Sequence, residues 1–263
     1  MKILFKAALG LGVAAAALAT PASATHDWGG YHWARTSNPF TLKLGDNVSS
    51  VWDSYLVTTS VDWTKSTVLD TVIIPGRANP RNCRPTAGRG EVCNFTYGNN
   101  GWLGIASISI TSGNHITQGT VKLNDTYFNT AKYNTPAWRN LVWCQEVGHL
   151  FGLGHQDENF NNANLDTCMD YTSYPESNQH PNQHDYDLLV SKYGQHLDSS
   201  TTVGAALPTG AAAEIGDTPS TWGRPATFLR DGRPDTYVRL DGPGRITVTH
   251  VFWVPGMGPE HHD

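Results

Sequence analysis

The chain has 263 residues, a formal net charge of −5 and four cysteines. This length is enough for one well-packed domain with an additional region. A mildly acidic chain without a basic cluster gives no reason to expect nucleic acid or a membrane surface as a partner, and we expect a monomer.

Residues 1–24 have the organisation of a secretory signal peptide. Two lysines precede an apolar stretch that ends at Ala19, and residues 21–24 (Pro-Ala-Ser-Ala) match a small-x-small cleavage site. The stretch is too short to span a membrane as a helix. We therefore expect a secreted protein whose mature chain begins near Thr25.

The next elements alternate between strand and helix. Alternating apolar residues predict a strand over 40–44, and β-branched residues predict another over 67–74. Between them, helical spacing of apolar residues predicts a helix over 48–56, with Asp46 or Asn47 as its N-cap.

Two further strands are predicted over 101–110 and 119–123. A second helix is expected to begin with Thr135 as its cap and Pro136 as its first residue, and to stop before Gly152. A third helix is expected after Asn182, where Asp185 has the spacing of a capping box, and should end at Gly194.

The composition changes after Leu197. Residues 198–215 are rich in Ser, Thr, Gly and Ala, which predicts a linker. Residues 216–263 are expected to form a small β-rich appendage with one strand over 245–254. The predicted organisation is thus a signal peptide, a main domain over 25–197, the linker and the appendage.

Four cysteines in an exported chain predict two disulfides, for which three pairings exist. Cys83 and Cys93 flank a short loop that a local bridge could close. Cys144 and Cys168 would then join the second predicted helix to the turn that follows it.

The segment Gln145–His155 (QEVGHLFGLGH) carries the chemistry. Gln145 and His149 lie one turn apart on the same helix face, and Glu146 projects beside that face. Gly152 lets the backbone reverse, so that His155 can return to the same point. Three ligands and one carboxylate would converge and leave a fourth position for water, as catalytic zinc sites require.

This segment resembles the metzincin superfamily of zinc endopeptidases, whose pattern is H-E-x-x-H-x-x-G-x-x-H. Residues 168–171 (Cys-Met-Asp-Tyr) are similar to the Met-turn of that group, and the helix over 182–194 is similar to the closing helix of matrixin-type catalytic domains. Segments 101–106 and 119–123 are similar to their substrate-lining edge strand and the strand after it. The resemblance covers residues 31–197, of which 145–171 are specific.

The resemblance implies an α+β fold with a twisted, mostly parallel sheet, an edge strand, two long helices, a Met-turn and a C-terminal helix. It implies Zn²⁺ held by Gln145, His149 and His155, and hydrolysis of peptide bonds by a metal-activated water with Glu146 as general base. Tyr171 would contact the metal or the oxyanion. A protein or peptide substrate would bind as an extended strand along residues 101–110.

The chain has Gln145 where the family has its first histidine. An amide oxygen is a weaker donor to zinc than imidazole, so we expect lowered metal affinity. The alternative is that Gln145 does not bind the metal, which is then lost or held by His149, His155 and another group such as Tyr171.

Seven further histidines lack ligand spacing and are expected at the surface or at helix caps, namely His26, His32, His115, His180, His184, His196 and His250. The sequence therefore favours a secreted zinc endopeptidase. One alternative is a catalytically inactive binding protein on the same fold, because of Gln145. Another is that the C-terminal region is the functional binding module.

Overall fold

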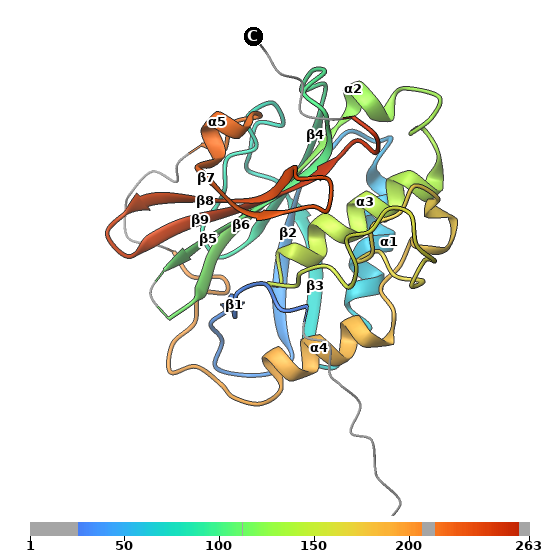
Figure 1. The fold of residues 1–263 in the computed structure, drawn as a ribbon. Coiled ribbons are helices and arrows are strands. Elements are labelled where there is room, and N and C mark those ends of the chain that lie inside the picture. Colours follow the sequence, from blue (N-terminus) through green and yellow to red (C-terminus); the bar gives the residue numbers. More distant parts are fainter. Residues whose placement is uncertain (1–25, 112, 207–213, 258–263) are drawn as a thin grey trace, which may run out of the picture.

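The computed structural model describes residues 26–111, 113–206 and 214–257. The predicted signal peptide and its cleavage site lie outside the described residues. The main body is an α+β fold in which helices pack on a large mixed sheet (Figure 1).

Nine strands of the described chain form this sheet, in the order β3-β2-β4-β6-β5-β9-β8-β7, with the short β1 also paired to β6. Pairing is parallel among β3, β2, β4, β6 and β1, and antiparallel among β6, β5, β9, β8 and β7. The strands are β1 His32–Trp33, β2 Phe40–Asn47, β3 Leu69–Pro75, β4 Gly90–Phe95, β5 Trp102–Thr111, β6 His115–Asn124, β7 Arg224–Phe228, β8 Pro234–Gly242 and β9 Arg245–Trp253.

The expectation that β5 is the edge strand is wrong. β9 pairs with it on the side away from β6, from Trp102 opposite Trp253 to Ile110 opposite Ile246. The C-terminal region therefore continues the sheet and, through Val248 and Phe252, contributes to the main hydrophobic core. Half of the sheet is consequently antiparallel, where a mostly parallel sheet was expected.

Helices α1 and α3 lie side by side on one face of this sheet (Figure 1). The described helices are α1 Asp53–Trp63, α2 Asp125–Phe128, α3 Pro136–His149, the 3₁₀ turn η1 Pro175–Ser177, α4 Gln183–Tyr193 and α5 Pro219–Trp222. Between α1 and α3, the indole of Trp52 stacks on that of Trp143 with 5.3 Å between ring centroids. Large aromatic side chains such as these supply much of the buried apolar area that stabilises the domain.

Helix α1 begins later than predicted, because its expected caps have other partners. Asp46 Oδ1 accepts a hydrogen bond from the backbone N–H of Val48. Asn47 donates to Glu91 and accepts from the backbone N–H of Ala78. The two polar side chains thus hold the loops at the end of β2 and are not available to a helix.

The predicted starts of α3 and α4 are confirmed. The Thr135 side chain accepts from the backbone N–H of Trp138, and Pro136 follows it as the first helical residue. At α4, Asn182 and Asp185 form a reciprocal capping box. These side chains satisfy N–H groups that have no partner within the helix, so they determine where each helix begins.

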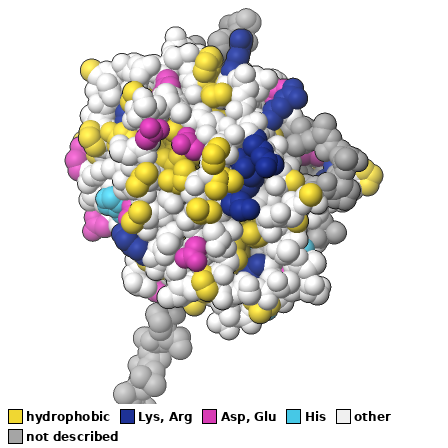
Figure 2. All heavy atoms as spheres, turned by 180° about the vertical axis from the view of Figure 1, so that it is seen from behind, with side chains coloured by type: hydrophobic (Ala, Val, Ile, Leu, Met, Phe, Trp, Pro, Cys, Tyr) yellow, Lys and Arg dark blue, Asp and Glu magenta, His cyan; other side chains and the backbone are white. Residues whose placement is uncertain are grey.

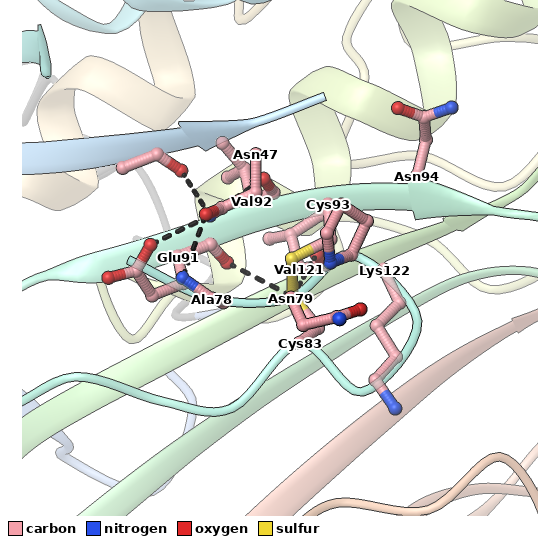
Figure 3. Close-up of a disulfide and its surroundings, with 12 residues drawn as sticks. Asn47, Ala78, Asn79, Cys83, Glu91, Val92, Cys93, Asn94, Val121 and Lys122 are labelled. Atoms are coloured by element: carbon pink, nitrogen blue, oxygen red, sulfur yellow. Dashed lines mark hydrogen bonds between the residues drawn. A yellow bond between two sulfur atoms is a disulfide. The ribbon is translucent and has the colours of Figure 1, made fainter. Parts of the chain in front are cut away.

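Both predicted disulfides are present, Cys83–Cys93 and Cys144–Cys168. Figure 3 shows the first bridge against β4, beside the hydrogen bonds that join Asn47 to Glu91 and Ala78. The second bridge ties α3 to the turn at residues 168–171. It therefore fixes the predicted Met-turn relative to the helix that carries the histidine motif.

No helix among the described residues is long and apolar enough to cross a membrane.

The rear face of the molecule carries hydrophobic side chains next to a group of Lys and Arg, and little histidine is visible there (Figure 2).

Candidate metal centre

Three histidines converge between α3, the turn after it and β9. His149 ends α3, His155 follows the turn, and His250 lies in β9. One ligand atom of each lies within 4.8 Å of those of the other two, and the side chains of His149 and His250 are buried. The sequence predicted that His149 and His155 meet, and the structure places them together.

The turn that returns His155 to His149 depends on Gly152. Its φ of +76° belongs to the left-handed region, where a residue with a Cβ is strained. A Cβ at this position would also lie 1.9 Å from the carbonyl oxygen of Tyr31. Two buried side chains then fix the backbone between the helix end and Gly152, since Trp33 donates to the Leu150 carbonyl and Tyr193 donates to the Phe151 carbonyl.

The hydrogen bonds of His149 and His155 leave two lone pairs facing each other. His149 Nδ1 donates to the Leu153 carbonyl at 2.8 Å, and His155 Nδ1 donates to the Glu158 carboxylate at 3.3 Å. Each Nε2 is then unprotonated in the neutral ring, yet the two Nε2 atoms are only 3.1 Å apart. Two lone pairs at this distance require a cation between them, either a shared proton or a metal ion.

The spacing of the two nitrogens suits zinc. Nitrogen ligands about 2.0–2.1 Å from a tetrahedral zinc lie roughly 3.3 Å from each other. The partners of the two Nδ1 atoms, a carbonyl and a carboxylate, are those that orient metal-binding histidines in proteins. The residues therefore fit a zinc ion between His149 and His155.

His250 is the third imidazole at this point, and its place in the sequence did not predict this. It lies opposite Ala106 of β5, on the same face of β9 as the core residues Val248 and Phe252. Its ring centroid is 4.1 Å from that of His149 and 4.5 Å from that of His155. The expectation that His250 is a surface or capping residue is wrong, because β9 pairs with β5 and turns this side chain inward.

Burial favours the uncharged form of His149 and His250. Desolvation lowers the pKa of His149 and of His250 well below the ordinary value, and the neighbouring histidines lower both further. Neutral imidazole is the form that binds a metal ion.

Glu146 is fully buried beside this cluster. Its Oε2 lies 3.5 Å from His250 Nδ1, and its Oε1 has no hydrogen-bond partner among the described residues. Gly104 of β5 leaves room for it, since a Cβ there would be 2.8 Å from Glu146 Oε1. Burial raises the pKa of the Glu146 carboxyl well above its usual range. A buried oxygen without a partner is costly, which favours a site that is completed by a ligand.

Gln145 lies one residue before Glu146 and is also fully buried. Its Nε2 donates to the carbonyl of Cys168 at 2.8 Å. Its Oε1 has no hydrogen-bond partner in the described part of the chain. The disulfide-linked turn thus orients the amide and leaves the oxygen, the atom that could bind a metal, unpaired.

The turn at residues 168–171 supports the histidines from the other side. The Tyr171 ring lies against His155, with 4.5 Å between centroids, and its hydroxyl is 2.7 Å from His250 Nε2. Met169 is buried against Gly148 of α3, where a Cβ would lie 2.6 Å from the Met169 Sδ. Both residues therefore lie next to α3 and the histidines.

A cavity of about 230 Å³ leads to the cluster, and its lining includes Trp28, His149, His155, Thr227, Thr236 and His250. The side of β5 away from β6, where an extended substrate was expected to bind, is occupied by β9.

Spacing along the chain could reveal His149 and His155, but it could not reveal His250, which is 95 residues beyond His155. The available signal was a single histidine at an inward position of the β-branched segment 245–254. His26, also expected at the surface, is buried against His184 and Asp185.

No protein-family model and no curated protein matches this chain.

Proposed function

We propose that this protein is a secreted zinc-dependent endopeptidase of metzincin type, in which His149, His155 and His250 hold the metal. The observation that carries the proposal is the 3.1 Å contact between the Nε2 atoms of His149 and His155, whose Nδ1 atoms are hydrogen-bonded to a carbonyl and a carboxylate oxygen. Three nitrogen donors form a common ligand set of catalytic zinc. A histidine of β9 thereby supplies the imidazole that is missing at Gln145.

Zinc, when bound, supplies a Lewis acid that polarises a carbonyl and makes water more acidic. Glu146 is the general base in this proposal, because its carboxyl is beside the histidines and has an unpaired oxygen. It takes the proton of the attacking water and returns it to the leaving amine. Tyr171 is the proposed donor for the oxygen that gains negative charge during the attack, and its hydroxyl would leave its 2.7 Å contact with His250 Nε2 to donate there.

The substrate in this proposal is a protein or peptide segment that enters through the cavity beside Trp28. An extended peptide can pair with β5 only if β9 separates from it, since β9 already makes those backbone hydrogen bonds. The two disulfides agree with a secreted protein, because such bonds persist in oxidising compartments.

The test compares wild-type protein with Glu146→Gln, both loaded with zinc. Glutamine keeps the shape of the side chain but cannot accept the proton, so we expect zinc content to be unchanged and cleavage of an unfolded protein substrate to fall by about 100-fold or more. Glu176→Gln, on the 3₁₀ turn η1, is the matched control and should cleave normally. Equal cleavage by wild type and Glu146→Gln would contradict the proposal.

A second candidate is a metal-binding protein without hydrolytic activity. The observation that favours it is that β9 covers β5 while Glu146 has no exposed surface. Zinc bound by His149, His155 and His250 without cleavage of any unfolded substrate would support this candidate over the endopeptidase.

A further inference from the structure

A second group of histidines surrounds one carboxylate oxygen on another part of the molecule. Oδ1 of Asp198 lies 3.6 Å from His32 Nε2, 3.2 Å from His115 Nε2 and 3.7 Å from His196 Nε2. The ligand atoms of His32, His115 and Asp198 all lie within 4.8 Å of one another. This group shares no residue with the candidate metal centre.

The proton positions again leave acceptor atoms facing each other. His32 Nδ1 donates to the Gly30 carbonyl at 2.9 Å, so its Nε2 is unprotonated in the neutral ring. That Nε2 is buried and has no hydrogen-bond partner among the described residues, although it faces the carboxylate oxygen. A lone pair that faces a carboxylate requires a cation between the two, either a proton that completes a His32–Asp198 ion pair or a metal ion.

Asp198 is arranged so that one oxygen remains for such a cation. Its Oδ2 accepts from the backbone N–H of Arg35 and from Arg35 Nη1 at 2.9 Å. The guanidinium therefore fixes the carboxylate through Oδ2, while Oδ1 faces the three imidazoles. The separations of 3.2–3.7 Å between Oδ1 and the nitrogens are near the roughly 3.3 Å between ligands of a tetrahedral zinc.

The other cluster with two histidines differs in this respect. The carboxylate of Asp185 already accepts hydrogen bonds from Gln156, Thr167 and the backbone N–H of Asn182. His26 Nε2 has a hydrogen-bond partner in His184 Nδ1, 3.0 Å away. The group around Asp185 is thus explained by hydrogen bonds, whereas in the group around Asp198 the buried Nε2 of His32 has no hydrogen-bond partner among the described residues.

We infer that His32, His115 and Asp198, with His196 as a fourth ligand at the exposed side, form a second, structural zinc site. The ligands come from β1, from the start of β6 and from the segment after α4, which runs back toward β1 (Figure 1). A zinc ion here would join three parts of the chain that are far apart in sequence. Its role is to stabilise the fold, because binding to the native state alone raises the free energy of unfolding.

The test counts zinc in the chelator-treated and reloaded mature chain by mass spectrometry. We expect two zinc ions in wild type, one in His115→Ala, one in His149→Ala and none in the double variant. His180→Ala removes a histidine that contacts a single carboxylate, that of Asp62, and serves as the matched control with two ions.

Thermal unfolding of His149→Ala isolates the second site from the proposed catalytic one. Zinc should raise the Tm of His149→Ala, and the rise should be lost when His115→Ala is added. If His115→Ala fails to fold, His196→Ala serves instead, since that side chain is 56% exposed. It should weaken binding in the same background by more than the roughly 100-fold that loss of an outer-shell partner can cost.

Equal zinc content in His115→Ala and wild type, or a Tm of His149→Ala that does not respond to zinc, would overturn the inference. Both outcomes are independent of peptide cleavage, so the second site can fail while the endopeptidase proposal stands, and the reverse.

Discussion

At the scale of single residues, the candidate centre depends on which ring nitrogen of each histidine carries its proton. The Leu153 carbonyl and the Glu158 carboxylate each accept a hydrogen bond from the Nδ1 of a histidine, and this sets which nitrogen of His149 and His155 faces the site. Identity and spacing predicted these two histidines. They could not predict the contacts that set the tautomers, because Leu153 accepts through its backbone.

The buried carboxyl of Glu146 should make the stability of the metal-free protein depend on pH. Burial raises its pKa, so its contribution to stability is complete below the unfolded pKa of about 4.3 and is lost as the pH rises toward the folded value. Glu146→Gln has no such loss. We therefore expect the Tm of the metal-free variant to match that of wild type near pH 4 and to exceed it above pH 7. The difference in Tm should be roughly 2–4 °C for each kcal/mol of unfolding free energy that wild type loses.

Thermal melts in the presence of a chelator, at a series of pH values, measure this difference. A Tm difference that is the same at every pH would show that the Glu146 carboxyl is not held in the protonated form by burial.

At the scale of elements, α3 and α4 were predicted with their caps because the signals are local. The sequence also indicated β5, β6 and β9 individually. It did not indicate that β9 pairs with β5, since strand partners distant in sequence are selected by the packing of whole faces. That single pairing brings His250 to the candidate centre.

The turn after α3 should be sensitive to Gly152→Ala. The substitution adds a Cβ in a left-handed conformation, which costs about 1–2 kcal/mol, and places it against the Tyr31 carbonyl. We expect a Tm loss well above that of Gly232→Ala, where φ is also positive but no atom lies within 4 Å of the added Cβ. Zinc affinity should fall only in Gly152→Ala, because this turn positions His155.

Melting curves and zinc titrations of the two glycine variants check this prediction. Equal Tm losses would show that the backbone near Tyr31 moves aside without cost, and unchanged zinc affinity would show that the turn does not position His155.

At the scale of the whole molecule, the C-terminal strands complete the domain. Composition marked residues 198–215 as a linker and 216–263 as an appendage, yet β9 shares the sheet and the core with α3. A composition rich in Ser, Thr, Gly and Ala indicates only that a segment has a flexible backbone. It carries no information on which surface the next strand will cover, so the sequence could not predict the covered face of β5.

The measurement that most directly tests the centre is zinc affinity in His250→Ala. It is made in the His115→Ala background, so that the second proposed site does not contribute, and by competition with a chromophoric chelator on protein shown to be folded by circular dichroism. We expect binding to weaken by more than the roughly 100-fold that loss of an outer-shell partner can cost, with His180→Ala unchanged. Wild-type affinity in His250→Ala would contradict the account, because the metal would then be held without the histidine of β9.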